Sequence, residues 1–355
     1  MKKIAILIFD ITKKAGTERA VCNLAGILSE SKKYSVSIIS VYSISGEAAY
    51  DIKEGVNIYH LGLSCATNMV AKLSMYKSLI AALKKISDQK KIDIVIGTKF
   101  GLNVMLFFLR KKIKTIVCEH FNYMSLKIHL RAIRKLLYPF LNSVVVLTRS
   151  DAKHYQFHKN VKIIQNSLSF FPEKQSELTN KRILAIGRLT PQKGFDLLIK
   201  AIFIIRNQCD DWEVKIIGSG EDEGELRSQI EYLQLGNIVK ICPPTNAIIQ
   251  EYLDASIFVL SSRYEGLPMV MIEAKTSGLP IVSFDCPEGP ADVVHHNEDG
   301  LLVENGNVEE LSKALLELMH NKEKRIQFGK KALENITQYE PKNVFTLWDN
   351  LLGGL

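Results

Sequence analysis

Short apolar runs alternate with helix-patterned segments along the whole chain, and this rhythm constrains the fold more than any other feature. Apolar, β-branched runs separated by amphipathic helices are typical of βα units around a parallel sheet. Two sets, each the size of a Rossmann-like domain, predict an α/β protein with two facing Rossmann-like domains and a cleft between them. The runs lie at 4–9, 35–41, 92–97, 115–118 and 143–147, and then at 182–186, 213–217, 238–241, 257–260 and 280–284.

The length of 355 residues also exceeds what one hydrophobic core usually sustains. Residues 166–181 are polar, contain a proline and show no periodicity, as expected of a linker. We therefore predict an N-terminal domain over 1–165, a linker over 166–181 and a C-terminal domain over 182–340. The sequence is 46% hydrophobic and 24% charged, which excludes a disordered chain.

Two further features concern the compartment. No apolar run approaches the roughly 18 residues of a membrane span, and the first run stops at Asp10, so we expect a buried strand and not a signal peptide. The six cysteines show no C-x-x-C pair and no zinc-ligand spacing. They are expected to be reduced thiols of a cytoplasmic protein.

Charge is divided unevenly between the halves. Residues 1–178 hold 28 Lys/Arg against 12 Asp/Glu, whereas residues 179–355 hold 18 against 26. Two helix-patterned segments, 69–86 and 126–137, carry many of the cations, the second through Lys127, Arg131, Arg134 and Lys135. Such helices suit an anionic membrane surface, or they pack on the sheet and leave their charges in water. No nucleic-acid-binding motif is present, so nucleic acid is not expected as a partner.

Two glycine-bearing loops follow strands in the second half. Residues 187–194 (GRLTPQKG) contain two cations five positions apart, Arg188 and Lys193. They are suited to a diphosphate, arginine through planar bidentate bonds and lysine as a point charge. Gly218 and Gly220 follow the next run and permit close backbone approach. Neither loop has the spacing of a P-loop or a dinucleotide fingerprint, which disfavours a nicotinamide enzyme.

Residues 262–274 (SRYEGLPMVMIEA) carry the most chemistry. Pro268 is placed as the first residue of a helix. The N–H groups around Gly266 and Leu267 then lie at a helix N-terminus, which is a natural seat for phosphate. Glu265 precedes this helix and Glu273 lies more than a turn inside it, so the two carboxylates should reach different parts of one ligand.

Burial makes Glu273 the more unusual of the two carboxylates, because its neighbours are apolar and a buried glutamate requires a partner. In the first half, His120 follows the 115–118 run beside Glu119. A histidine at the carboxyl end of a strand is either structural or part of a site. Gly16, after the first run, opens a helix and is a second candidate phosphate-facing turn.

Together these motifs resemble the family-four retaining glycosyltransferases, whose GT-B fold has two facing Rossmann domains. The likeness covers nearly the whole chain and is strongest from 181 to 303, where the motif 286–290 (CPEGP) follows those above. Residues 16–19 (GTER) resemble the family's Gly-Gly-x-Glu-Arg loop, with Ala15 in place of the first glycine. The resemblance also implies that 341–355 forms a helix that crosses back to the N-terminal domain.

The resemblance implies catalytic roles for four residues. Arg188 and Lys193 would hold the donor diphosphate and stabilise the leaving nucleotide. Glu265 would contact the donor sugar hydroxyls, and His120 would reach the sugar from the opposite wall. No metal or other cofactor is expected, because two cations and a helix N-terminus can serve the departing diphosphate. No residue identifies itself as a general base.

The resemblance further implies a set of donor-binding residues, with Glu273 at the ribose. The donor-binding set is Gly16, Arg188, Lys193, Gly218, Gly220, Glu265, Gly266, Leu267, Pro268 and Glu273. The implied activity is retaining transfer of a hexose or N-acetylhexosamine from a UDP-sugar to a saccharide acceptor, lipid-diphosphate-linked, in cell-surface polysaccharide biosynthesis. Such an enzyme would be cytoplasmic and peripheral at the inner face of the cell membrane.

The sequence is also compatible with three other functions. One is a metal-dependent transferase that uses residues 221–223 (EDE) as an acidic motif. Another is a nucleotide-sugar epimerase on the same fold. A third is a non-catalytic subunit that binds a nucleotide sugar.

Overall fold

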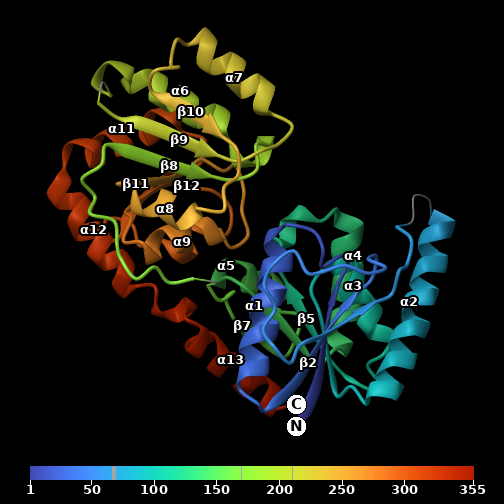
Figure 1. Ribbon diagram of the computed structural model, residues 1–355. Helices are drawn as coiled ribbons and strands as arrows, with labels where there is room; N and C mark the ends of the chain where they lie inside the picture. Colours follow the sequence, from blue (N-terminus) through green and yellow to red (C-terminus); the bar gives the residue numbers. More distant parts are fainter. Residues whose placement is uncertain (66–68, 169, 210) are drawn as a thin grey trace. The chain divides into compact units, whose positions relative to one another are not determined.

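The computed structural model describes residues 1–355 except 66–68, 169 and 210, and it divides into two compact units (Figure 1). Unit 1 comprises Met1–Ser167 together with Tyr339–Leu355, and unit 2 comprises Leu168–Gln338. The chain first passes between the units at the start of the segment predicted as the linker. It returns to unit 1 for its last 17 residues.

Unit 1 is built on a seven-stranded parallel sheet in the order β3-β2-β1-β4-β5-β6-β7. The order reverses between β1 and β4, and ligands of open α/β sheets bind at the carboxyl ends of the strands beside such a reversal. The strands are β1 (Lys2–Ile8), β2 (Tyr34–Ser40), β3 (Asn57–His60), β4 (Ile94–Gly97), β5 (Lys114–Glu119), β6 (Ser143–Val146) and β7 (Val161–Ile163).

Helices cover both faces of this sheet. Alternate residues of β1 point to opposite sides, so that Ile4 and Ile6 pack in one apolar cluster while Ala5 and Leu7 pack in another. The first cluster lies under α1 and α13, and the second under α2 and α3. The helices are α1 (Gly16–Glu30), α2 (Met69–Lys90), α3 (Phe100–Asn103), α4 (Ile128–Leu137), α5 (Arg149–Ala152) and α13 (Pro341–Gly353).

The last helix, α13, is an integral part of unit 1 and lies beside α1 (Figure 1). Its Val344 and Trp348 are buried in the cluster under α1. Asp349 accepts hydrogen bonds from Lys33 Nζ at 2.7 Å and from Tyr34 OH at 2.6 Å. Buried apolar side chains and the hydrogen bonds of Asp349 therefore both hold the last helix on unit 1.

Unit 2 has a six-stranded parallel sheet in the order β10-β9-β8-β11-β12-β13, with its reversal between β8 and β11. The strands are β8 (Arg182–Ile186), β9 (Glu213–Ile217), β10 (Val239–Cys242), β11 (Ile257–Leu260), β12 (Ile281–Asp285) and β13 (Gly300–Glu304). The helices are α6 (Phe195–Ile205), α7 (Glu223–Tyr232), α8 (Ile248–Leu253), α9 (Met269–Thr276), α10 (Pro290–Val293), α11 (Val308–His320) and α12 (Lys322–Glu334).

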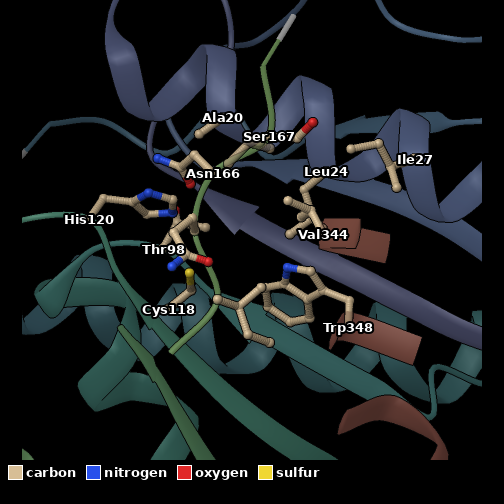
Figure 2. Close-up of a pocket in the computed structure, with 13 residues that line it drawn as sticks. Ala20, Leu24, Ile27, Thr98, Cys118, His120, Asn166, Ser167, Val344 and Trp348 are labelled. Atoms are coloured by element: carbon tan, nitrogen blue, oxygen red, sulfur yellow. The ribbon is translucent and has the colours of Figure 1, made fainter. Parts of the chain in front are cut away.

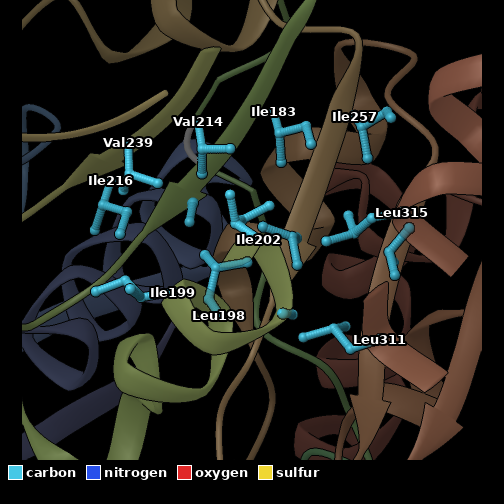
Figure 3. Close-up of a cluster of buried hydrophobic side chains, with 14 of the residues drawn as sticks. Ile183, Leu198, Ile199, Ile202, Val214, Ile216, Val239, Ile257, Leu311 and Leu315 are labelled. Carbon is cyan, nitrogen blue, oxygen red and sulfur yellow. The ribbon is translucent and has the colours of Figure 1, made fainter. Parts of the chain in front are cut away.

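The main core of unit 2 lies on the face of the sheet covered by α6, α7 and α11. Figure 3 shows Ile183, Val214 and Ile216 of the sheet meeting Leu198 and Ile202 of α6. Strands buried on both faces read as continuous apolar runs, which is why the sequence pattern marked them clearly.

All ten predicted runs form strands, whereas β3, β7 and β13 were not predicted. Each of the three missed strands is at the edge of its sheet. β3 and β7 are only partly buried and carry polar residues, so they lack a continuous apolar run. Pro268 directly precedes α9, which begins at Met269 and not at the proline.

The two basic segments are helical, but one predicted cation is not at the surface. Within α4, the placement of Arg134 among solvated charges is wrong: its side chain is 1% exposed, and Nη2 donates to Glu119 Oε2 at 3.1 Å. In the other helix, α2, the side chains of Met69, Lys72 and Leu73 lie outside the described residues. Within the described ranges, no helix is long and apolar enough to cross a bilayer.

Candidate functional site

The reversal point of the unit 2 sheet brings two loops together. One follows β8 and spans 187–194, and the other follows β11 and spans 261–268. β8 and β11 are neighbours whose connections leave in opposite directions, and ligands of open α/β sheets bind at the carboxyl ends of such strands. Both loops contain residues that the sequence marked as candidate donor contacts.

Lys193 and Glu265 form an ion pair across these loops. Lys193 Nζ donates to Glu265 Oε1 at 2.6 Å, and the same oxygen accepts from Ser262 Oγ at 2.6 Å. The two side chains are 15% and 7% exposed. Ser261 Oγ donates to the Lys193 backbone oxygen at 3.1 Å, which ties the loops at a second level. Sequence reasoning placed both residues at a ligand but did not predict that they bond each other.

A second ion pair braces the same loops from outside. Arg263 binds both carboxylate oxygens of Asp196 at 2.8 and 2.7 Å, and it also donates to Pro191 O at 2.7 Å. Burial disfavours the charged form of Asp196, but the Arg263 guanidinium outweighs this effect and holds the pKa of Asp196 below its usual value. The 187–194 and 261–268 loops are therefore fixed relative to each other.

Arg188 differs from Lys193 in being exposed. Its Nη2 lies 3.5 Å from Gln192 Oε1, at the limit of a hydrogen bond. Gln192 itself donates to Tyr264 O at 3.0 Å. The guanidinium thus stands at the rim of the loop pair.

Gly218 and Gly220 are required by contacts within unit 2. A Cβ on Gly218 would lie 1.9 Å from Gly187 O, and one on Gly220 would lie 2.1 Å from Leu189 O. The backbone of the loop after β9 therefore rests directly on the backbone of the loop after β8. The sequence pattern correctly indicated that another group lies close to the backbone at Gly218 and Gly220. In this structure that group is the backbone of the loop after β8.

The start of α9 is supported by the CPEGP motif at 286–290. Gly289 packs against Gly266 O and Pro268 Cδ. Leu267, the residue between Gly266 and Pro268, therefore lies in the segment that Gly289 supports. Cys286 is buried beside this loop; burial, followed by the nearby Glu265 carboxylate, raises the pKa of its thiol to about 12. A thiol with so high a pKa is not a nucleophile at neutral pH.

Glu273 lies on α9 and is buried, as its apolar neighbours predicted. Tyr252 OH donates to Glu273 Oε2 at 2.9 Å. Tyr252 is on α8, and no local sequence pattern links it to Glu273. The requirement for a partner was predictable, but the identity of the partner was not.

Unit 1 has its own cluster at the reversal between β1 and β4. Gly16 is the first residue of α1, and a Cβ added to it would meet no atom within 4 Å. On the same helix, the buried Glu18 accepts from Lys99 Nζ at 3.0 Å. Lys99 directly follows Thr98, whose hydroxyl donates to Leu7 O at 2.6 Å. Lys99 and Thr98 were not among the predicted site residues.

His120 lines a small pocket of unit 1 with Thr98, Cys118 and Asn166 on one side and Trp348 on the other (Figure 2). The pocket, of about 10 Å³, has room for about one water molecule and is too small for a sugar ring. Burial, reinforced by the Lys99 charge, lowers the pKa of His120 to about 4, so the ring is neutral at pH 7. Within the described residues, its buried Nδ1 makes no hydrogen bond.

The carboxylate next to His120 is structural. Glu119 Oε1 accepts from Asn103 Nδ2 at 3.0 Å and from Tyr138 OH, and Oε2 accepts from Arg134. This network is buried beneath α4. Glu119 therefore does not share a ligand with His120, although it fixes the carboxyl end of the strand that carries it.

Residues 221–223, considered as an acidic metal motif, are not gathered into one. Glu223 Oε1 instead accepts from Arg227 Nη2 at 2.9 Å. Across the part of the chain that the structure describes, no group of three or more His, Cys, Asp or Glu side chains is arranged to hold a metal ion.

Comparison with known proteins places these features in a family. The model of the family described as "Glycosyl transferases group 1" matches residues 168–335. An uncharacterized glycosyltransferase of Haemophilus influenzae is 32% identical over 361 residues, covering 99% of this chain and 100% of that protein. A Campylobacter jejuni protein, named as an α-1,4-N-acetyl-D-galactosaminyltransferase acting on a saccharide-PP-undecaprenol, is 28% identical over 362 residues, covering 99% of this chain and 98% of that protein.

Among solved structures, Anabaena HepE in complex with UDP and glucose resembles this chain with a TM-score of 0.79 at 17% identity, over 100% of both chains. This likeness concerns the fold, which is the two-domain GT-B fold that the sequence predicted. The H. influenzae relative spans essentially the same length at an identity sufficient to define kinship. The chain belongs to the group 1 (family-four) glycosyltransferases.

Proposed function

We propose that this chain is a retaining glycosyltransferase that moves a hexose or an N-acetylhexosamine from a UDP-sugar to a lipid-diphosphate-linked saccharide in cell-surface polysaccharide biosynthesis. The observation that carries the proposal is the Lys193–Glu265 pair at the reversal point of the unit 2 sheet. The UDP and glucose in the HepE structure and the undecaprenyl-diphosphate acceptor in the C. jejuni name support the choice of donor and acceptor class.

The pair suits a nucleotide-diphosphate sugar because its two members match the two ends of the transferred bond. Lys193 Nζ can exchange the Glu265 carboxylate for a donor phosphate oxygen without losing an anionic partner. Glu265 can then accept hydrogen bonds from sugar hydroxyls, while Ser262 keeps its carboxylate in place. Arg188, exposed at the rim, adds a second cation for the diphosphate.

In this mechanism, the bond between the sugar C1 and the diphosphate oxygen breaks, and negative charge builds on the departing UDP. Lys193, Arg188 and the N–H groups at the start of α9, around Gly266 and Leu267, stabilise that charge. The acceptor hydroxyl forms its bond to C1 on the same face, and its proton passes to a phosphate oxygen of the leaving group. No metal ion is assigned a step.

The remaining donor contacts are assigned by chemistry. Glu273 would bind the ribose hydroxyls, and Gly218, Gly220 and Pro268 would shape the nucleotide side of the site. In unit 1, the neutral ring of His120 would hydrogen-bond the donor sugar from the carboxyl end of β5. Gly16 leaves free the space that its Cβ would occupy, which allows a phosphate to approach its backbone.

The acceptor class follows from charge. The strongly basic first half suits both the diphosphate of a lipid-linked acceptor and an anionic membrane. We therefore place the enzyme at the inner face of the cell membrane, as a peripheral protein.

The test is transfer from a panel of nucleotide sugars, with and without a polyprenyl-diphosphate-linked saccharide, by purified protein. We expect product only when both substrates are present, with the anomeric configuration of the donor retained. Lys193→Ala and Glu265→Gln should each lower kcat/KM at least about a hundredfold.

A matched control exists for these variants. Lys215 and Glu251 form an ion pair of similar burial with an Nζ–Oε1 distance of 2.7 Å, on β9 and α8. Lys215→Ala should keep transfer within a few-fold of wild type. Full activity in Lys193→Ala and Glu265→Gln would reject the site, and conversion of the nucleotide sugar without an acceptor would instead identify an epimerase.

A further inference from the structure

The outer side of α4 exposes large apolar side chains to water. Ile128 is 77% exposed and Leu136 is 69% exposed. They are eight residues apart, so they lie on the same side of the helix two turns from each other. Ile133 within the helix is 39% exposed, and the flanking turns add Met124 at 54% and Phe140 at 58%. We call Met124, Ile128, Ile133, Leu136 and Phe140 the α4 face.

The opposite side of α4 is already packed onto unit 1. Arg134 is buried on that side and bonds Glu119 at the end of β5, while Leu130 and Leu137 are half-buried. Tyr138, directly after the helix, is also buried and bonds Glu119. The inner side therefore fixes the helix, and the α4 face is additional apolar surface that this packing does not use.

The charge around the α4 face has one sign. Between Phe108 and Phe140 the chain contains eight Lys/Arg and a single acidic residue, Glu119, which is buried and paired with the buried Arg134. Of the other cations, Lys112 lies 3.8 Å from Asp88. Lys127 and Lys135 are exposed on α4 or next to it. An exposed apolar strip beside exposed cations fits an interface whose outside is anionic and whose inside is apolar. A lipid bilayer with anionic headgroups has this layering.

The second basic helix of unit 1 provides the contrast. On α2, the described residues exposed from Ser74 onward are small or polar, among them Lys77, Lys84 and Lys85. Its larger apolar side chains in that stretch, such as Leu79 and Leu83, are buried. Charge without exposed apolar surface attracts a protein to a membrane but does not insert it. Among the described side chains of these two helices, those of α4 provide both components and those of α2 provide charge alone.

We propose that the α4 face docks on a membrane containing anionic lipid. Ile128, Leu136 and Phe140 enter the boundary between headgroups and acyl chains, and Lys127 and Lys135 remain at the lipid phosphates. The inference rests on the proposed function in that a lipid-linked acceptor is held in such a membrane. The α4 face is then the surface that brings the enzyme to its acceptor.

The test is flotation of the full chain with vesicles of phosphatidylglycerol and phosphatidylcholine, and with vesicles of phosphatidylcholine alone. Wild type should bind the anionic vesicles. The double variant Ile128→Ser/Leu136→Ser should lose at least about tenfold in partitioning. The control is Ile44→Ser/Tyr232→Ser, which removes two side chains that are 82% and 85% exposed elsewhere, and it should bind like wild type.

A second set of variants separates the contribution of the lysine charges to vesicle binding from that of apolar insertion. Lys127→Gln/Lys135→Gln should weaken binding at low salt more than Lys84→Gln/Lys85→Gln does, and the difference should shrink at high salt. Leu136→Trp should show a blue-shifted emission when anionic vesicles are added. No loss of binding in Ile128→Ser/Leu136→Ser, or no blue shift, would overturn the proposal.

Two further measurements distinguish a failure of the membrane proposal from a failure of the proposed function. If light scattering shows that wild type is a dimer and Ile128→Ser/Leu136→Ser a monomer, then a second copy covers the α4 face and the membrane proposal is wrong. UDP binding, measured without vesicles, should be equal in wild type and this variant. Vesicle binding by a protein that does not bind UDP would reject the proposed function while leaving the docking surface standing.

Discussion

The two units have the same strand order around their reversal points but use them differently. In unit 2, the loops after β8 and β11 carry the Lys193–Glu265 pair, which remains 15% and 7% exposed. In unit 1, the first turn of α1 and the loop after β4 carry the Glu18–Lys99 pair, in which Glu18 is buried and Lys99 is partly exposed. Both reversal points thus hold a lysine–glutamate pair that joins two different connections.

The difference lies in what surrounds each pair. In unit 2, the loop after β8 rests on the backbone of the loop after β9 at Gly218 and Gly220, and side-chain bonds tie it to the loop after β11. In unit 1, Gly16 stands at a helix start with open space beside it. The same topology therefore gives close backbone packing beside the reversal point in one unit and open space beside it in the other.

The fully buried ion pairs of the two units offer the largest stability effect. Arg134 with Glu119 in unit 1, and Lys275 with Asp299 in unit 2, are almost completely inaccessible. Arg134→Met and Lys275→Met should each lower the free energy of unfolding of their own unit by about 3–5 kcal/mol, because each leaves a carboxylate buried without its cation.

Each unit has its own fluorescent reporter for this measurement, since the two tryptophans are Trp348 in unit 1 and Trp212 in unit 2. Urea unfolding of single-tryptophan versions should assign each loss to one unit. The double variant Glu119→Gln/Arg134→Met should recover part of the loss. A loss below about 1 kcal/mol in both single variants would mean that these pairs do not stabilise the units.

Substitution of Gly218 in unit 2 or Gly16 in unit 1 should have a smaller effect on stability, and the two substitutions compare the two reversal points directly. Gly218→Ala should cost about 1–3 kcal/mol of stability because its methyl group would overlap Gly187 O. Gly16→Ala should change stability by no more than about 0.5 kcal/mol yet reduce kcat/KM if a phosphate approaches that backbone. Thermal unfolding and transfer assays on both variants test this. Equal destabilisation by the two substitutions would contradict the contrast.

Acid should act on unit 1 through His120, with the smallest of these effects. Burial lowers the pKa of His120 from its usual 6.5 to about 4, so between these two pH values the unfolded chain binds a proton that the folded chain does not bind. The contribution of the neutral His120 ring to stability is fully present above pH 6.5 and declines as the pH falls toward 4. The decline between pH 7 and 5 should be shallower in His120→Gln than in wild type. The exposed His320 on α11 supplies the control, and His320→Gln should follow the wild-type curve.

The sequence predicted buried features better than exposed or long-range ones. Strands buried on both faces were recognisable from their apolar runs, whereas the edge strands β3, β7 and β13 were not. Lys193 and Glu265 were predicted as site residues because both follow strands. Their mutual bond was not, since it joins residues 72 positions apart.

Arg134 shows the opposite error. Helical spacing placed it among cations at the surface, but a buried carboxylate at the end of β5 takes it into the interior. Only the tertiary structure brings Glu119 under α4. The partner of Glu273 was likewise out of reach, because Tyr252 comes from a separate helix.

The proposed function requires Lys193 to hold the donor diphosphate, and titration of UDP into purified protein by calorimetry tests this directly. Lys193→Ala should weaken the Kd for UDP at least about tenfold, and Lys215→Ala, which breaks a comparably buried pair, should leave it unchanged. Equal UDP affinity in wild type and Lys193→Ala, with both proteins folded, would contradict the account.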